Sequence, residues 1–184
     1  LVVSGILAAR LLNVQGRGDL AIAMLFPSLV ALIGDIGISQ GIAYHLASGR
    51  LTGKFVPSIV RRTLTAQVCA TISTYIIVFV WLGVGQRLLP TPWLMIGACS
   101  IPGLLANQYA LGILQGLGNF SLLNIVRLLP TAIYAAMLAG YALLLDASVI
   151  GVLSVWVMSV LASGGIGLGI SQTAAIVASR RTGE

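Results

Sequence analysis

The stretch from Ala147 to Ser179, ASVIGVLSVWVMSVLASGGIGLGISQTAAIVAS, contains no charged residue. An uncharged apolar run of about 18 residues or more is a candidate transmembrane helix. Three further uncharged runs precede it, at 63–86, 88–126 and 128–145. The 184 residues are 58% hydrophobic and 8% charged, whereas a soluble domain is about 45–50% apolar and about 25% charged. The sequence therefore predicts an integral membrane protein and excludes a soluble enzyme.

The predicted organisation is a single transmembrane domain over residues 1–184, an all-α polytopic helical bundle. The run 88–126 is too long for one crossing, so we divide it at Gly116–Asn119, where Gly-Leu-Gly-Asn predicts a turn. We expect the chain to begin inside a helix. The predicted spans are a partial one at 1–12 and complete ones near 19–46, 63–83, 92–115, 121–145 and 148–178.

The formal charge of +6 does not indicate nucleic acid, because the basic residues lie between the apolar runs and form no aromatic-interleaved patch. Lys and Arg accumulate in cytoplasmic loops. Alternate connections carry seven basic residues on one side and three on the other, which predicts that the first group is cytoplasmic. The seven are Arg50, Lys54, Arg61, Arg62, Arg127, Arg180 and Arg181; the three are Arg10, Arg17 and Arg87.

One predicted span carries an interior acid. Ser28, Asp35 and Ser39 are spaced so that they share one helical face. A carboxylate in hydrocarbon costs several kcal/mol unless it meets water, a partner or a proton. We therefore expect Asp35 to point into the bundle, either as a structural hydrogen-bonding group or as a site that handles a coupling ion or substrate.

Other spans carry weaker polar stripes, which either line a hydrated cavity or form hydrogen bonds between helices. For the bundle as a whole we favour the cavity. Three pairs of glycines with GxxxG spacing predict close helix packing. The stripes are Thr63, Gln67, Thr71 and Thr74; Gln108, Gly112 and Gln115; and Asn124, Arg127 and Thr131. The pairs are Gly37 and Gly41, Gly112 and Gly116, and Gly165 and Gly169.

No enzyme active site can be assembled from the sequence. His45, the single histidine, has no metal-ligand spacing to either cysteine, and no glycine elbow presents a serine nucleophile. Cys69 and Cys99 both lie inside apolar runs, which argues against a disulfide scaffold. We predict no enzyme activity, no cofactor and no metal site.

Two segments resemble a known transporter group. Residues 9–21, ARLLNVQGRGDLA, followed by Gly34-Asp-Ile-Gly37, resemble the start of polysaccharide-biosynthesis flippases of the multidrug/oligosaccharidyl-lipid/polysaccharide exporter superfamily. Residues 114–120, LQGLGNF, with Asn124 and Arg127, resemble the connection between spans 4 and 5 in that group. Asn13 departs from the usual glycine, and Val14-Gln15 replaces a frequent Pro-Glu.

The resemblance implies two six-helix lobes around a central cavity, of which this chain supplies one lobe with its first helix cut. The second lobe of the same longer chain is then a partner, together with the lipid bilayer and a lipid-linked glycan. The resemblance places the protein in the cytoplasmic (inner) membrane of a bacterium. It implies flipping of lipid-linked oligosaccharide or polysaccharide precursors by alternating access.

An anionic, hydroxyl-rich headgroup cannot cross hydrocarbon alone, so we expect a cationic and polar cavity lining. The candidate lining residues are Arg10, Arg127, Gln108, Gln115 and Asn124. An alternative is a cation-coupled exporter of organic cations, in which Asp35 is the principal site. A membrane glycan polymerase or ligase, and a non-transporting scaffold, are further alternatives.

Overall fold

The protein was analysed as a computed structural model, which describes residues 12–51, 53–81, 89–144 and 148–182. These residues form helices joined by turns, so the predicted all-helical bundle is confirmed for the described part of the chain. The elements are α2 (Val14–Gly34), α3 (Ile38–Ala47), the 3₁₀ turn η1 (Gly53–Phe55), α4 (Val56–Tyr75), the π-helical extension η2 (Ile76–Trp81), α5 (Thr91–Ala98), α6 (Ile101–Gly116), α7 (Phe120–Leu144) and α8 (Val149–Thr182).

Five helical segments are long and apolar enough to cross a membrane, which indicates a multi-pass membrane protein. They are Val14–Gly34, Gly53–Trp81, Thr91–Gly116, Phe120–Leu144 and Val149–Arg180. Spanning segments are helical because hydrocarbon offers no partner for a free backbone N–H or C=O group. The predicted partial span 1–12 lies almost entirely outside the described residues.

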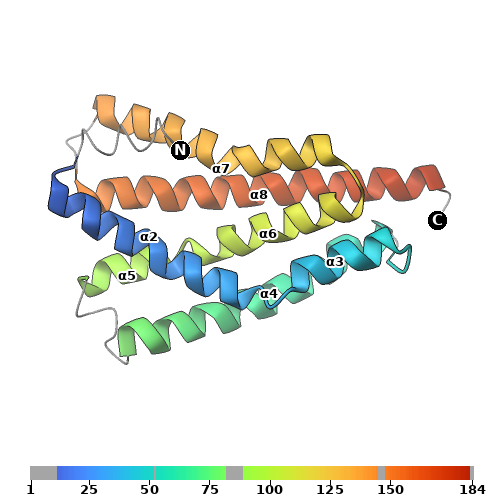
Figure 1. Ribbon diagram of the computed structural model, residues 1–184, viewed down its shortest axis with the longest axis horizontal. Helices are drawn as coiled ribbons and strands as arrows, with labels where there is room; N and C mark the ends of the chain where they lie inside the picture. The colour runs from blue at the N-terminus through green and yellow to red at the C-terminus, as the bar shows by residue number, and fades with distance from the viewer. Residues whose placement is uncertain (1–11, 52, 82–88, 145–147, 183–184) are drawn as a thin grey trace.

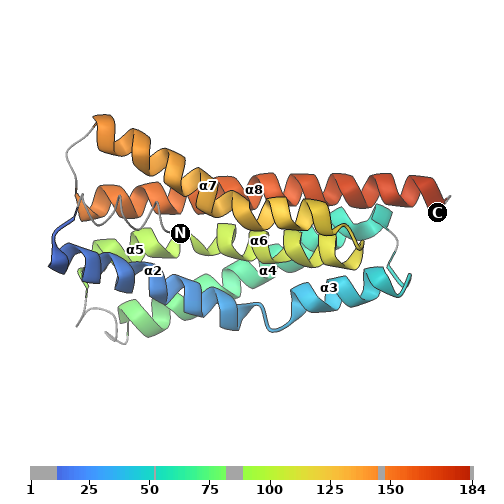
Figure 2. The same ribbon diagram turned by 45° about the horizontal axis from the view of Figure 1, so that its top comes forward.

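Figure 1 shows that α8 runs the length of the molecule and that α6 and α7 lie along it, while α2, α3 and α4 form the opposite side of the bundle. After a 45° turn the same elements still run roughly parallel (Figure 2). The α3–α4 connection, the α6–α7 turn and the end of α8 lie at one end of the bundle. We call it the basic end, because Arg50, Lys54 and Arg180 lie there and Arg61, Arg62 and Arg127 lie in adjoining turns.

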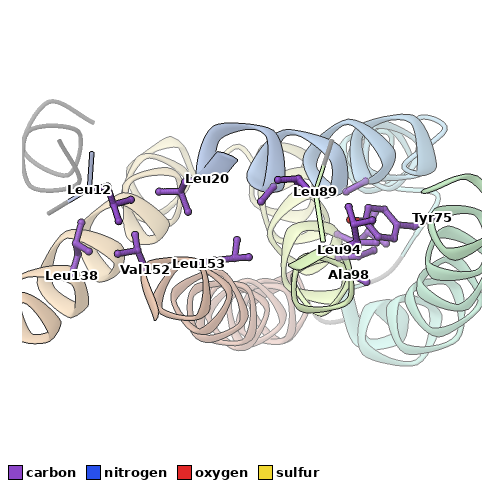
Figure 3. Close-up of a cluster of buried hydrophobic side chains, with 13 residues drawn as sticks. Leu12, Leu20, Tyr75, Leu89, Leu94, Ala98, Leu138, Val152 and Leu153 are labelled. Carbon is purple, nitrogen blue, oxygen red and sulfur yellow. The ribbon is translucent and has the colours of Figure 1, made fainter. Parts of the chain in front are cut away.

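The main core lies between the first halves of α2 and α8 and helices α4, α5 and α6. Leu20, Tyr75, Leu94 and Leu153 are almost completely buried in it, and Figure 3 shows these side chains coming from different helices.

The prolines lie mostly where a helix begins. Pro57, Pro92 and Pro102 lie in the first turns of α4, α5 and α6, where a missing N–H is harmless. Pro27 and Pro130 lie inside α2 and α7.

Helix α6 occupies the centre and contacts α2, α3, α4, α7 and α8. Its glycines allow close approach: a Cβ at Gly112 would meet the Ser39 carbonyl of α3, and one at Gly116 would meet Ala43. The packing role predicted for this glycine pair is therefore correct. Cβ atoms at Gly37, Gly41, Gly165 and Gly169 would meet nothing within 4 Å, so those two pairs make no such contact.

The structure divides two of the expected spans. The expected helix at 19–46 is interrupted at Asp35–Gly37, and the expected helix at 92–115 turns at Cys99–Ser100. Helix α4 also begins earlier than expected, at Val56. Mean hydropathy over a window does not register such interruptions, because the residues on both sides of each one are apolar.

Candidate functional site

The break between α2 and α3 has an unusual backbone. Gly37 has φ +74°, and Ile36 has φ +45°, a left-handed conformation that costs a β-branched residue roughly 1–2 kcal/mol. Helical bonding is irregular here, because the Ile36 N–H donates to the Ile33 carbonyl at 3.3 Å and the Ile38 N–H donates to the Asp35 carbonyl at 2.8 Å. Strain of this kind persists only where surrounding contacts fix it, and it is concentrated at functional sites.

Asp35 belongs to this break, so it lies within the expected span 19–46 but not within a continuous helix. Its carboxylate accepts from the Ser39 hydroxyl at 2.6 Å and from the Ser39 N–H at 3.3 Å. Ser39 is in the first turn of α3. The positive end of the α3 dipole and these two donors stabilise the negative charge of the half-buried carboxylate.

Helix α4 supplies partners to the break. The Gln67 side-chain N–H donates to the Gly34 carbonyl at the end of α2, and the Tyr109 hydroxyl of α6 donates to the Gln67 side-chain oxygen. Thr71, one turn after Gln67, packs so closely that a Cβ at Gly34 would lie 2.5 Å from its hydroxyl. We call Asp35, Ser39, Gln67, Thr71 and Tyr109 the break cluster.

The break cluster lies deep in the bundle. Ser39, Gln67, Thr71 and Tyr109 are buried, and Gln67 is halfway along the candidate span Gly53–Trp81. A polar group in an apolar interior costs free energy unless it has a partner. The bonds of Gln67 and Tyr109 meet that requirement and fix how α2, α4 and α6 face one another.

What the break cluster can bind depends on which of its oxygen atoms already accept hydrogen bonds. The Gly34 carbonyl and the Gln67 side-chain oxygen already accept hydrogen bonds. The Asp35 carboxylate carries the negative charge of the cluster and, within the described ranges of the chain, accepts from Ser39 alone. It therefore keeps acceptor capacity for a further hydrogen-bond donor or a monovalent cation.

Only some residues of the predicted polar stripes come together in the structure. The Asp35 and Gln67 stripes meet in the break cluster, although Ser28, Thr63 and Thr74 instead donate to carbonyl groups of their own helices, at 2.7, 2.9 and 2.9 Å. Among the predicted lining residues, Gln108 is half-buried, while Gln115, Asn124 and Arg127 are exposed. Arg10 lies outside the described residues.

The exposure of Asn124 and Arg127 follows from the rotation of α7. This helix buries Leu123 and Val126 against α6 and α8, and neighbouring positions therefore face outward. Arg127 and Asn124 are not brought to the break cluster, and neither makes an ion pair or side-chain hydrogen bond with the part of the chain that the structure describes.

Sequence reasoning did not select Tyr109. It follows Gln108 within an apolar span, and a buried tyrosine hydroxyl ordinarily requires a hydrogen-bond partner, so its residue type was an available signal.

Comparison with protein-family models, curated proteins and solved structures finds no match to this chain.

Proposed function

We propose that the chain is one lobe of a membrane transporter that flips lipid-linked oligosaccharide or polysaccharide precursors by alternating access. The observation that carries the transporter proposal is the interruption of the second span at Asp35–Gly37, with a carboxylate at the break. Discontinuous helices near the membrane midplane are characteristic of transporters, where they bind substrates or ions and let segments move relative to one another.

The cargo proposal rests on the flippase-like motifs and on the exposed polar side chains Asn124 and Arg127 of α7. Arg127 is a fixed cation on a spanning helix and has no acidic partner among the described residues, so it requires water or an anion. A phosphate-bearing glycan headgroup in a hydrated cavity would supply both. In this proposal Arg127 and Asn124, with Gln115 nearby in sequence, face a second lobe, and Arg10 and Gln108 contribute to the same lining.

Complementation of a flippase-deficient bacterial strain by the full-length protein tests this proposal. Arg127→Ala should lower surface polysaccharide at an unchanged amount of membrane protein, and Arg127→Lys should restore part of it, because a point cation keeps the attraction but loses the bidentate fork. Arg180→Ala is the matched control, since Arg180 is also exposed toward the basic end. Wild-type export from Arg127→Ala would rule out the cationic cavity.

Asp35 favours a second candidate, a cation-coupled exporter of organic cations. In such a protein Asp35→Asn should abolish transport and leave the fold intact, because the amide keeps the shape and can still accept from Ser39 but loses the charge. For a glycan flippase we expect a partial loss at most. Measuring Asp35→Asn in the same complementation assay separates the two cargo classes.

A further inference from the structure

A groove of about 500 Å³ lies between the first turns of α4 and the second half of α8. Its position is set by close packing just before α4, where a Cβ at Gly53 would meet the Ala175 carbonyl of α8. Helix α4 begins near α8 at the basic end and diverges from it toward the other end of the bundle (Figure 1). The groove residues of α4 therefore lie in the first half of the candidate span Gly53–Trp81.

The α4–α8 groove is lined by polar groups at one end and by apolar side chains at the other. Ser58, Arg61 and Gln172 supply polar groups, and Arg61 is exposed. Val60, Leu64 and Leu168 supply an apolar floor, which is continuous with the second hydrophobic cluster of the core. Leu64 is nearly one helical turn deeper than Arg61, about 4.5 Å at 1.5 Å per residue. A ligand that fits this groove has a polar head and an apolar chain.

The positive charge around the groove indicates that the polar head of the ligand is anionic. Six basic residues lie at or near the basic end, and the two acidic residues that the structure describes lie elsewhere, Asp19 at the start of α2 and Asp35 at the break. Arg61 makes no ion pair with any described residue. An arginine binds phosphate through two parallel N–H groups, and basic pockets between spanning helices bind anionic lipid headgroups.

We propose that the α4–α8 groove binds a phospholipid with an anionic headgroup, with its phosphate at Arg61 and Ser58 and an acyl chain over Leu64 and Leu168. The site is independent of the proposed transport function and of its cargo. It requires the groove, the unpaired Arg61 and a bilayer.

Native mass spectrometry of the full-length, delipidated protein in detergent tests the proposal. Phosphatidylglycerol and phosphatidylcholine with identical acyl chains are titrated separately, so that the two lipids differ only in the headgroup. We expect phosphatidylglycerol to bind about tenfold more tightly, because the choline cation of phosphatidylcholine offsets the phosphate charge that Arg61 attracts. Arg61→Gln should remove that preference, because the cation that distinguishes the two net headgroup charges is lost. Arg61→Lys should retain part of it.

Arg62→Gln is the matched control, because Arg62 is the adjacent exposed arginine of the same helix and does not line the groove. It should change phosphatidylglycerol binding by less than about twofold, as expected for a surface charge outside the site. Equal losses from Arg61→Gln and Arg62→Gln would overturn the proposal, because binding would then follow net charge alone. Equal affinity for the two lipids, or complete displacement of phosphatidylglycerol by excess inorganic phosphate, would also overturn it.

Discussion

Replacing Gln67 by leucine tests whether the break cluster holds the bundle together. The change keeps a side chain of similar size but removes the bond to the Gly34 carbonyl and the bond from the Tyr109 hydroxyl. Side-chain hydrogen bonds inside membrane bundles average about 0.6 kcal/mol and reach about 1.7 kcal/mol. For two bonds, we expect the free energy of unfolding to fall by about 1–3 kcal/mol.

The assay is reversible unfolding in mixed micelles, followed by circular dichroism, for a double-mutant cycle with Tyr109→Phe. Alone, Tyr109→Phe should cost about 0.6–1.7 kcal/mol, the range for one bond. On the Gln67→Leu background it should cost clearly less, because the hydroxyl has already lost its bond to Gln67 and keeps only the one with Thr63. Thr74→Val is the control, since exposed Thr74 bonds to the Ala70 carbonyl of its own helix at 2.9 Å. An equal cost of Tyr109→Phe in both backgrounds would refute the network.

Three further predictions concern the backbone and the orientation. Gly37→Ala should lower the free energy of unfolding by about 1–2 kcal/mol through backbone conformation alone. Gly41 has equally open space but no positive φ, so Gly41→Ala should be neutral or stabilising by up to about 1 kcal/mol. Equal effects of the two changes in the unfolding assay would contradict the left-handed break. Gly112→Ala should cost about 1–3 kcal/mol, because its Cβ would press on the Ser39 backbone and displace α3; a neutral result would show that α3 does not pack there. The orientation is tested in a variant lacking Cys69 and Cys99, with a single cysteine introduced at exposed Ser48 or at exposed Gln15. A membrane-impermeant thiol reagent should reach the cysteine at position 48 only from the cytoplasmic side and the one at position 15 only from the outside. Labelling of both positions in intact cells would contradict the orientation.

The polar stripes illustrate where sequence reasoning reached its limit. Two stripes, those of Asp35 and Gln67, meet in the interior, while Arg127 and Asn124 face outward. Helical spacing shows which residues share a face, but the direction of that face depends on how the helix is rotated against its neighbours. Thr63 and Thr74 also bond to their own helix, so a polar stripe does not by itself require a cavity.

The amino-acid sequence by itself determined that the chain is a helical membrane protein, because hydropathy and the absence of charge act locally, residue by residue. It also placed the turns near Gly118 and the clustering of basic residues at one end. Only the tertiary structure showed the break at Asp35–Gly37 and the partnership of Gln67 with Gly34 and Tyr109. Those features depend on contacts between helices distant in sequence, because a freed carbonyl in an apolar interior persists only where another helix brings a donor to it.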